Sequence, residues 1–457
     1  MSLVLKFGGS SVADAACVLR VADIVKAASP KSPVVVVSAM GKTTDALFAA
    51  AQAAERGETQ AALNALGEIV ARHQKTCGEL WKGEAPVDLQ QFVVALSTQI
   101  DMLLRGVALL RELSARSRDA IVSYGELLSS QILAAYLHSH GTPTSWLDVR
   151  RVMRTDSRFG EAEPQTNDIK SLVRTELTPL MGEGRIVVTQ GYIGSTKEGI
   201  TTTLGRGGSD YSASLLGAAI GATEVQIWTD VEGILTADPR MVKEATPILE
   251  LSFREAAELA AFGAKVLHPA TIQPAVEANI PVTVRHTMRP EGRFSTITAQ
   301  GGTGSPRPAT AIASRSPIEV ITIESTRMLA QSGFLGRIFE VFGRLGVSVD
   351  VVATAEVSVS LTVEASAPID AIRKELSAFA HVSVASKRAL VALVGERLKH
   401  TPGLAARVFG AISTINVEMI SMGSNEINLS LVVEGKDEAA AVRLLHRALF
   451  AANGEAR

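Results

Sequence analysis

Short apolar runs, rich in β-branched residues, recur along the first part of the chain and constrain its fold most. The runs are Leu3–Phe7, Val34–Val37, Ala120–Val122, Ile186–Thr189, Val225–Trp228 and Pro281–Val284. Segments rich in Ala, Leu and Glu separate most of them. Continuous apolar strands that alternate with helical stretches are typical of a parallel sheet with helices on both faces. We therefore predict an α/β fold with an open, mostly parallel sheet rather than an antiparallel barrel.

Length and composition indicate a globular protein of several domains. The chain has 457 residues, which corresponds to about three domains of roughly 150 residues each. Hydrophobic residues make up 46% of the chain and charged residues 20%, so large cores can be buried. Because 45 Lys and Arg nearly balance 47 Asp and Glu, and only 4% of residues are aromatic, nucleic acid is not an expected partner.

The amino terminus shows no export signal, because Lys6, Gly8 and Gly9 interrupt the apolar run that a secretory peptide needs. The longest apolar stretches are short, as in Leu215–Ile220, and fall below the roughly 18 to 20 residues that cross a bilayer. Cys17 and Cys77 are the only cysteines, too few for a disulfide framework. We expect a cytoplasmic protein with reduced thiols that does not span a membrane.

Two features mark the domain organisation. Residues Thr44–Arg118 have almost no strand signal, so we predict a helical insertion that caps the sheet. Residues Gly301–Pro308 are rich in Gly, Ser and Pro, and we place a domain boundary in this turn-rich segment.

An internal repeat with an offset of 70 residues follows the boundary. Aligning Gly333 with Gly403 also aligns Arg337 with Arg407, Phe339 with Phe409, Val347 with Val417, Glu356 with Glu426, Ser360 with Ser430, Leu361 with Leu431, Val363 with Val433 and Glu364 with Glu434. Each copy carries a helical pattern followed by an alternating strand pair, which predicts two βαββ-type units. Crevices between such units suit small polar ligands. The repeat is interpreted as a ligand sensor, with a dimerisation platform as the alternative.

Three motifs can carry chemistry, and the first and third of them follow predicted strands. In Lys6–Ser11 two glycines let the backbone approach a phosphate beside a lysine, although an ordinary strand-to-helix turn has the same pattern. Thr201–Asp210 combines hydroxyls, glycines and Arg206 before an apolar helix at Tyr211–Ala219, which favours an anion site. Glu126, in Ser123–Glu126, suits a substrate ammonium or, alternatively, only the start of a helix.

Other segments give weaker signals. Gly41-Lys42-Thr43 lacks the earlier glycine of a P-loop, because Val36 stands there. Gly205–Asp210 lacks the third glycine of a dinucleotide fingerprint. Trp228–Gly233 and Ala237–Arg240 suit a ribose or a phosphate, and Lys265 lies in an apolar setting where a cation needs an anionic partner. No histidine belongs to a nucleophile or zincin signature, so hydrolase chemistry has no support.

Taken in order, these motifs resemble those of the aspartate kinases, members of the amino-acid kinase family with carboxy-terminal ACT repeats, and match the lysine-sensitive, monofunctional type. The segments that carry the resemblance are Lys6–Ser11, Ser123–Glu126, Thr201–Asp210, Trp228–Arg240, Phe262–Pro269 and the repeat from Ser316 onward. The resemblance implies an amino-acid kinase domain at residues 1–300, with its sheet sandwiched by helices. Two ferredoxin-like βαββαβ ACT domains would follow at 315–390 and 391–457.

The implied reaction transfers the γ-phosphoryl group of Mg-ATP to the side-chain carboxylate of L-aspartate. The product, 4-phospho-L-aspartate, serves the synthesis of lysine, methionine and threonine. Because a carboxylate with a pKa of about 3.9 is ionised at pH 7, the reaction needs no strong general base. Catalysis would come from positioning and charge neutralisation.

The resemblance also assigns roles to individual residues. Lys6 would stabilise the migrating phosphoryl group and Asp210 would hold Lys6, while Gly8, Gly9, Gly207 and Gly208 would cradle the phosphates. Glu126 would receive the ammonium of aspartate and Arg206 its α-carboxylate, with Ser38, Thr44, Thr203 and Ser209 lining the pocket. The nucleotide would contact Ser10, Thr229, Asp230, Leu235, Arg240 and Lys265. Magnesium would be held by phosphates and water, without a dedicated set of protein ligands.

An allosteric lysine site is implied in the first repeat. The residues that match the pattern are Met328, Gly333, Phe334, Leu335, Ser348, Val349, Asp350, Thr354 and Glu356. Asp350 and Glu356 supply negative charge for a diammonium ligand, and threonine is the alternative effector. A homodimer through the ACT domains is expected, with a tetramer as the alternative.

The sequence departs from the family pattern at three positions. Ser10 replaces a threonine and keeps its hydroxyl, Leu235 replaces a tyrosine that packs near the nucleotide, and Gln331 replaces a serine in the lysine pattern. Two competing interpretations are weaker. A kinase for glutamate or N-acetylglutamate would not be expected to have the ACT repeat and Ser123–Glu126, and a non-catalytic sensor would be expected to lack Lys6 or Asp210.

Overall fold

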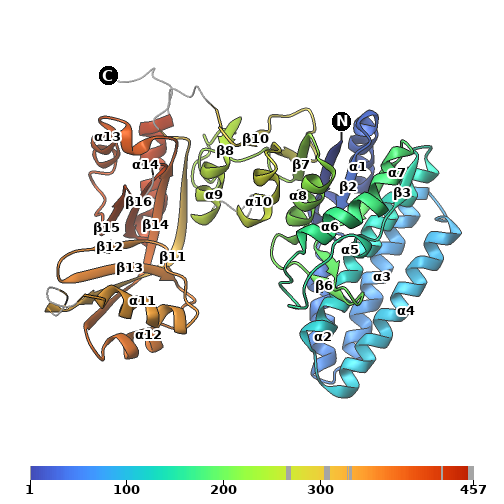
Figure 1. Cartoon of the computed structure of the whole chain (residues 1–457), viewed down its shortest axis with the longest axis horizontal. Helices are drawn as coiled ribbons and strands as arrows, with labels where there is room; N and C mark the ends of the chain where they lie inside the picture. The colour runs from blue at the N-terminus through green and yellow to red at the C-terminus, as the bar shows by residue number, and fades with distance from the viewer. Residues whose placement is uncertain are drawn as a thin grey trace. The chain divides into compact units, whose positions relative to one another are not determined.

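The computed structural model describes residues 2–263, 269–302, 309–326, 328, 332–423 and 426–450 (Figure 1). It divides into two compact units. The first unit comprises Met1–Ile234 and Val266–Gly301, and the second comprises Leu235–Lys265 and Gly302–Arg457.

The first unit is built on a mostly parallel sheet, as predicted. Its strands lie in the order β3-β4-β2-β1-β7-β9-β10. All neighbours are parallel except β10, which is antiparallel to β9. The strands are β1 (Leu3–Phe7), β2 (Val34–Val37), β3 (Thr144–Trp146), β4 (Ile186–Gln190), β7 (Glu224–Thr229), β9 (Val282–His286) and β10 (Ser295–Thr298). Because every residue of β1 and β2 is buried, these strands appear in the sequence as unbroken apolar runs.

Helices cover this sheet. Helix α8 (Gly208–Ile220) packs against β1 and β7 and against α10 (Pro269–Glu277). Helix α5 (Ala115–Ser139) packs against β3 and β4 and also contacts α1 (Ala15–Ala28). Shorter elements complete the unit, namely α6 (Thr166–Leu172), α7 (Thr178–Gly182) and an antiparallel hairpin of β5 (Ile193–Ser195) and β6 (Thr201–Thr203).

The predicted insertion is helical. It contains α2 (Thr43–Glu55), α3 (Thr59–Trp81) and α4 (Val87–Leu110), which pack against one another and, with α5, form the helical layer in blue and cyan in Figure 1. The predicted strand Ala120–Val122 is wrong, because these residues lie inside α5. Nearly all residues of α5 from Asp119 to Leu137 are buried, so this helix has no polar face to reveal its period in the sequence.

Helix α4 differs from a second expectation. The helix has 24 residues, and the mean hydropathy of an 18-residue window within it reaches 1.6, so by length and composition it is one helix of the described chain that could cross a membrane. Gln, Ser and Thr interrupt the apolar residues of α4, so a search for unbroken apolar runs does not detect this helix. Leu96, Ile100 and Leu104 are buried, whereas Val94, Met102 and Leu109 are exposed. Core helices of other folds pass the same test, so the finding is weak evidence for a membrane span.

The second unit is dominated by an antiparallel sheet in the order β12-β13-β11-β14-β16-β15. Its strands are β11 (Ala311–Glu324), β12 (Val352–Thr354), β13 (Ser358–Glu364), β14 (His381–Val394), β15 (Met419–Met422) and β16 (Asn428–Glu434). Its helices are α11 (Phe334–Arg344), α12 (Ile369–Leu376), α13 (Leu404–Ala411) and α14 (Glu438–Phe450), and β8 (Glu250–Ser252) and α9 (Phe253–Ala261) also belong to this unit.

Two apolar cores correspond to the two repeats. Phe334, Ile338 and Leu361 lie in the first core, and Leu404, Val408 and Leu431 occupy the second. The long strands β11 and β14 serve both cores. Ile312, at the start of β11, packs in the second core, whereas Ile321, on the same strand, packs in the first. Along the sequence, β11 therefore contributes a residue to the second core before it contributes one to the first.

Candidate active site

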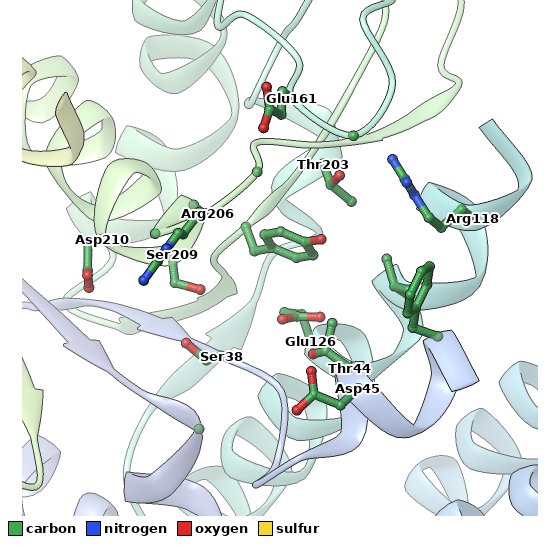
Figure 2. A pocket seen from close by; sticks show the side chains of 18 of the residues that line it. Ser38, Thr44, Asp45, Arg118, Glu126, Glu161, Thr203, Arg206, Ser209 and Asp210 are labelled. Carbon is green, nitrogen blue, oxygen red and sulfur yellow. The ribbon is translucent and has the colours of Figure 1, made fainter. Parts of the chain in front are cut away.

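A cavity of about 900 Å³ opens in the first unit (Figure 2). It brings together all the residues predicted to bind aspartate and most of those predicted to handle the phosphoryl group. These are Lys6, Gly8, Gly9, Ser38, Thr44, Glu126, Thr203, Arg206, Gly207, Gly208, Ser209 and Asp210. Arg206, Ser209 and Asp210 lie on one side of the pocket in Figure 2, and Arg118 lies on the opposite side.

The parallel strands explain why these residues meet. Lys6 lies on β1, and Ser38 follows β2, so both reach the carboxyl edge of the sheet, where open α/β folds bind ligands. The loops behind the two strands touch through backbone hydrogen bonds from Ser38 N to Phe7 O (3.1 Å) and from Gly41 N to Gly9 O (3.0 Å). A Cβ atom on Gly9 would lie 2.8 Å from the Ala39 carbonyl oxygen. Only glycine allows this close approach.

Lys6 and Asp210 form an ion pair inside the cavity. The Lys6 Nζ atom lies 2.7 Å from Asp210 Oδ1, and the two side chains are only 11% and 15% exposed. Asp210 lies in the first turn of α8, where the helix dipole favours a carboxylate. The pair holds the lysine ammonium over the start of that helix.

The amino terminus of α8 provides a backbone donor beside this pair. Gly207 adopts a left-handed conformation with φ of 73° and precedes the first helical residue, Gly208. Thr201–Asp210 therefore leads into a helix, as predicted. Gly208 N and Asp210 N donate to Gly205 O and Gly207 O, so the Ser209 N–H is the donor in this turn that can bind an anion next to Lys6 and Arg206.

Glu126 forms the opposite chemical feature, a buried carboxylate. It comes from the middle of α5 and not from the end of a strand, and it is 3% exposed. Ala39 N donates to Oε1 at 3.3 Å, whereas Oε2 has no partner in the described part of the chain. Burial raises the pKa of the Glu126 carboxyl to about 8. An ammonium group placed against Oε2 would offset the cost of ionising this carboxyl.

Sequence reasoning missed Asp119, which precedes Glu126 by about two turns of α5. The Asp119 side chain is 1% exposed. It accepts hydrogen bonds from Thr203 N (2.9 Å), Thr203 Oγ1 (3.0 Å) and Gly160 N (2.8 Å). Burial raises the pKa of the Asp119 carboxyl, and these hydrogen bonds oppose the shift. Asp119 thus ties β6 to a loop that lines the cavity.

Other lining residues were also missed. They are Asp45, Phe48, Arg118, Val122, Arg158, Phe159, Gly160, Glu161, Tyr192 and Gly205. One signal was available, because Arg118, Val122 and Glu126 are spaced four residues apart and share one face of a helix. That spacing is informative only once α5 is known to be a helix.

The remaining nucleotide candidates lie outside the cavity lining. Ser10 is exposed in a short helical turn, Gly9–Val12, and Thr229 and Asp230 follow β7. Leu235 and Arg240 belong to the second unit, where Arg240 pairs with Asp238. Lys265 lies outside the described residues. Across the described ranges, no group of three or more His, Cys, Asp or Glu side chains is arranged to hold a metal ion.

The predicted effector residues surround the start of α11 and the segment that leads to β12. Gly333, with φ of 86°, caps α11, Phe334 is buried, and Leu335 is exposed. Asp350 forms an ion pair with Arg315 of β11. The other members of the predicted set, Met328, Ser348, Val349, Thr354 and Glu356, are all at least partly exposed. Gln331 lies outside the described residues.

Comparisons with known proteins agree with this architecture. The amino acid kinase family model matches residues 1–286, and an ACT domain model matches residues 391–449. The lysine-sensitive aspartokinase 3 of Escherichia coli is 39% identical, with 98% of this chain and 99% of that protein aligned. The chloroplastic aspartokinase 1 of Arabidopsis thaliana is 37% identical, with 98% of this chain and 80% of that protein aligned.

Two solved structures of E. coli aspartokinase III share the fold. The R-state complex with aspartate and ADP superposes with a TM-score of 0.83 at 40% identity and covers 98% of this chain and 100% of that one. The T-state complex with lysine and aspartate gives a TM-score of 0.81 at 40% identity, with 98% and 99% covered.

Proposed function

Because this chain belongs to the aspartokinases of the amino acid kinase family, we propose that its cavity transfers the γ-phosphoryl group of ATP to the side-chain carboxylate of L-aspartate. The product is 4-phospho-L-aspartate, the first intermediate on the route to lysine, threonine and methionine. The observation that carries this proposal is the placement of the Lys6–Asp210 pair and the buried Glu126 carboxylate in the lining of one cavity.

The charges of the cavity fit an amino acid with two carboxylates. Glu126 has a free oxygen for the substrate ammonium, and Arg206 offers a planar guanidinium for two hydrogen bonds to the α-carboxylate. The hydroxyls of Ser38, Thr44, Thr203 and Ser209 line the space between them. The side-chain carboxylate of aspartate is then free to face Lys6.

The reaction needs neutralisation of charge more than proton transfer. The attacking carboxylate is already ionised at neutral pH, and Lys6 and the Ser209 N–H at the start of α8 neutralise the oxygens of the migrating phosphoryl group. Asp210 keeps the Lys6 ammonium in place. Lys265, Thr229, Asp230, Ser10, Leu235 and Arg240 remain proposed nucleotide contacts.

Magnesium fits this site as a partner of the nucleotide. Asp210, a carboxylate of the cavity lining, is engaged by Lys6, so we infer that phosphate oxygens and water hold the ion. When bound, it would supply charge neutralisation between the phosphates.

We infer that lysine inhibits the enzyme through the first repeat, with threonine as the alternative effector. The E. coli relative is named for its lysine sensitivity, and its T-state structure contains lysine. A homodimer through the repeats is proposed, with a tetramer as the alternative, and the exposed Leu335 and Phe339 on α11 offer apolar surface for it. The free thiols of Cys17 and Cys77 are consistent with a cytoplasmic enzyme.

The test is ATP-dependent formation of the acyl hydroxamate by the purified protein, with aspartate and glutamate compared side by side. Hydroxylamine traps an acyl phosphate, so product with aspartate and little with glutamate supports the proposal. Equal product from both amino acids, or none from either, contradicts it. Titration of lysine and of threonine in the same assay assigns the effector.

A further inference from the structure

A pair of buried hydroxyls joins two loops at the carboxyl edge of the parallel sheet. Ser11 lies in the turn after β1, and Thr287 is the first residue after β9. Their Oγ atoms lie 2.7 Å apart, although 276 positions separate the residues in sequence. The two residues are only 3% and 2% exposed. Because a hydroxyl buried to this extent needs a hydrogen-bond partner, the pair holds the loop after β1 to the loop after β9.

The end of β7, the strand between β1 and β9, joins the same junction. Ser11 Oγ donates to the Trp228 carbonyl oxygen at 3.4 Å, and Gly8 N donates to the same oxygen at 3.2 Å. From the other side, Thr287 N donates to Thr229 O at 2.8 Å. Trp228 and Thr229 are the last two residues of β7. Ser11 and Thr287 therefore connect the ends of three neighbouring strands.

This junction fixes the glycine loop of the cavity. Gly8 and Gly9 line the cavity, and Ser11 closes their turn through a hydrogen bond from its N–H to Gly8 O at 2.9 Å. On the β2 side, Gly41 N holds Gly9 O at 3.0 Å. On the β9 side, the bond between Ser11 and Thr287 holds the loop. The glycine loop is thus fastened from both sides.

From this geometry we propose that Ser11 and Thr287 are positioning residues for the nucleotide phosphates. Their hydrogen bond keeps the glycine loop, which would approach the phosphates, in place against Thr229, a proposed nucleotide contact. Neither residue is in the cavity lining, so both act through the backbone of the loops that they join. The inference rests on the proposed function, because it concerns the same site.

The junction should affect ATP and not aspartate. The proposed aspartate contacts belong to other elements, since Glu126 comes from α5 and Arg206 from the turn before α8. A shift of the glycine loop would misplace the phosphates and leave these two residues where they are. A change in kcat/KM for ATP without a change in the KM for aspartate is therefore the expected sign of this role. A general loss of stability would not produce that split.

Two substitutions of Thr287 separate the hydrogen bond from packing. Thr287→Val keeps the size of the side chain and removes the hydroxyl, whereas Thr287→Ser keeps the hydroxyl and removes a methyl group. We expect kcat/KM for ATP to fall about tenfold in Thr287→Val, because a buried hydroxyl loses its partner and the loop shifts. In Thr287→Ser it should stay within about twofold of the wild type. Wild-type kinetics in Thr287→Val, or a larger loss in Thr287→Ser, would overturn the proposal.

Ser11→Ala provides an independent variant if Thr287→Val does not fold. It breaks the same bond from the other loop and should give the same fall in kcat/KM for ATP, with the KM for aspartate kept. The double variant Ser11→Ala/Thr287→Val should be no worse than the more impaired single variant, because a single link is lost. Losses that multiply in the double variant would contradict joint action of the two hydroxyls.

A hydroxyl pair in the second unit provides the matched control. Thr322 Oγ1 on β11 lies 3.0 Å from Ser360 Oγ on β13. Thr322→Val removes one hydroxyl of this pair and, without lysine in the assay, should leave kcat/KM for ATP at the wild-type value. A fall equal to that of Thr287→Val would overturn the proposal, because loss of any such pair would then have the same effect.

Titration of ADP with magnesium, followed by calorimetry, separates this inference from the proposed function. The Kd for ADP should rise about threefold or more in Thr287→Val and stay at the wild-type value in Thr287→Ser. A wild type that binds ADP and forms no hydroxamate from aspartate contradicts the proposed function, while the titration still tests the junction. An active wild type with an unchanged Kd and unchanged kinetics in Thr287→Val contradicts only this inference.

Discussion

Lys6 Nζ lies 2.7 Å from Asp210 Oδ1, although the two residues are separated by most of the first unit in sequence. Each side chain is more than four-fifths buried, so each charge depends on the other for its stability. The ammonium still has two N–H groups to donate to a phosphoryl oxygen. The pair therefore fixes a cation at the place where negative charge develops.

Asp210→Asn should abolish this arrangement without changing the size of the side chain. Loss of one preorganised electrostatic group costs about a hundredfold or more in kcat, and we expect a drop of that order. The KM for aspartate should change much less. Steady-state hydroxamate kinetics give both values, and an unchanged kcat would contradict a role for the pair.

The pH dependence should report Glu126. Its pKa is raised to about 8 by burial, so below that pH the free protein holds the carboxyl neutral, and an ammonium binds it poorly. We expect kcat/KM for aspartate to rise with pH, by about tenfold per unit below the pKa, and to level off above it. Glu126→Gln should give a lower and flat profile. The same rising limb in this variant would show that another group titrates.

The shift at Glu126 also has a consequence for stability. The pKa is higher in the folded protein than its ordinary value of 4.5, so the folded state binds the proton more tightly. The free energy of unfolding should therefore fall as the pH rises from 4.5 to about 8. Glu126→Gln should lose that decline, as denaturant melts at pH 6 and pH 8 can show.

Gly9→Ala should damage both the fold and the site. The new Cβ would lie 2.8 Å from Ala39 O and 2.9 Å from Gly41 O, so the loops behind β1 and β2 must separate. We expect a loss of about 1 to 3 kcal/mol in the free energy of unfolding and loss of most activity. Gly106→Ala is the matched control, because nothing lies within 4 Å of its Cβ position in α4. It should stabilise the protein slightly.

Arg315 should weaken the response to lysine, because its ion pair with Asp350 competes with an ammonium group for that carboxylate. Both side chains are mostly buried, at 23% and 20% exposed. We expect Arg315→Gln to lower the lysine concentration that halves activity. Arg388→Gln is the matched control, because it breaks an ion pair with Glu418 in which both side chains are 23% exposed. This pair lies outside the predicted effector set, so its loss should leave the lysine concentration that halves activity unchanged. A higher concentration for Arg315→Gln would mean that Arg315 supports the site.

The elements best predicted from the sequence are those whose apolar residues form an unbroken run or a regular pattern along the chain. The bounds of β1 and β2 agree with the predicted runs because strands buried on both faces contain only apolar residues. The helical pattern of the first repeat, which forms α11 (Phe334–Arg344), was predicted because it has an apolar face on a polar background. By contrast, Ala120–Val122 was misassigned because α5 is buried all round.

The site residues that were predicted are likewise those that belong to a motif continuous in sequence. Lys6 and Arg206 were found because glycine-rich motifs surround them and carry a recognisable chemistry. Asp119 was missed because its partner Thr203 lies 84 positions away, and only the fold brings the two together. Tyr192 was missed because a single aromatic residue after a strand gives no signal of a left-handed backbone.

The most direct test of the account is hydroxamate formation from aspartate by Lys6→Ala beside Lys75→Ala. Lys75 lies on α3 with its side chain 77% exposed, so its loss should leave activity at the wild-type level. Lys6→Ala should retain the fold, as circular dichroism can show, and lose at least about a hundredfold in kcat. Substantial activity in folded Lys6→Ala would contradict the assignment of this cavity as the phosphoryl-transfer site.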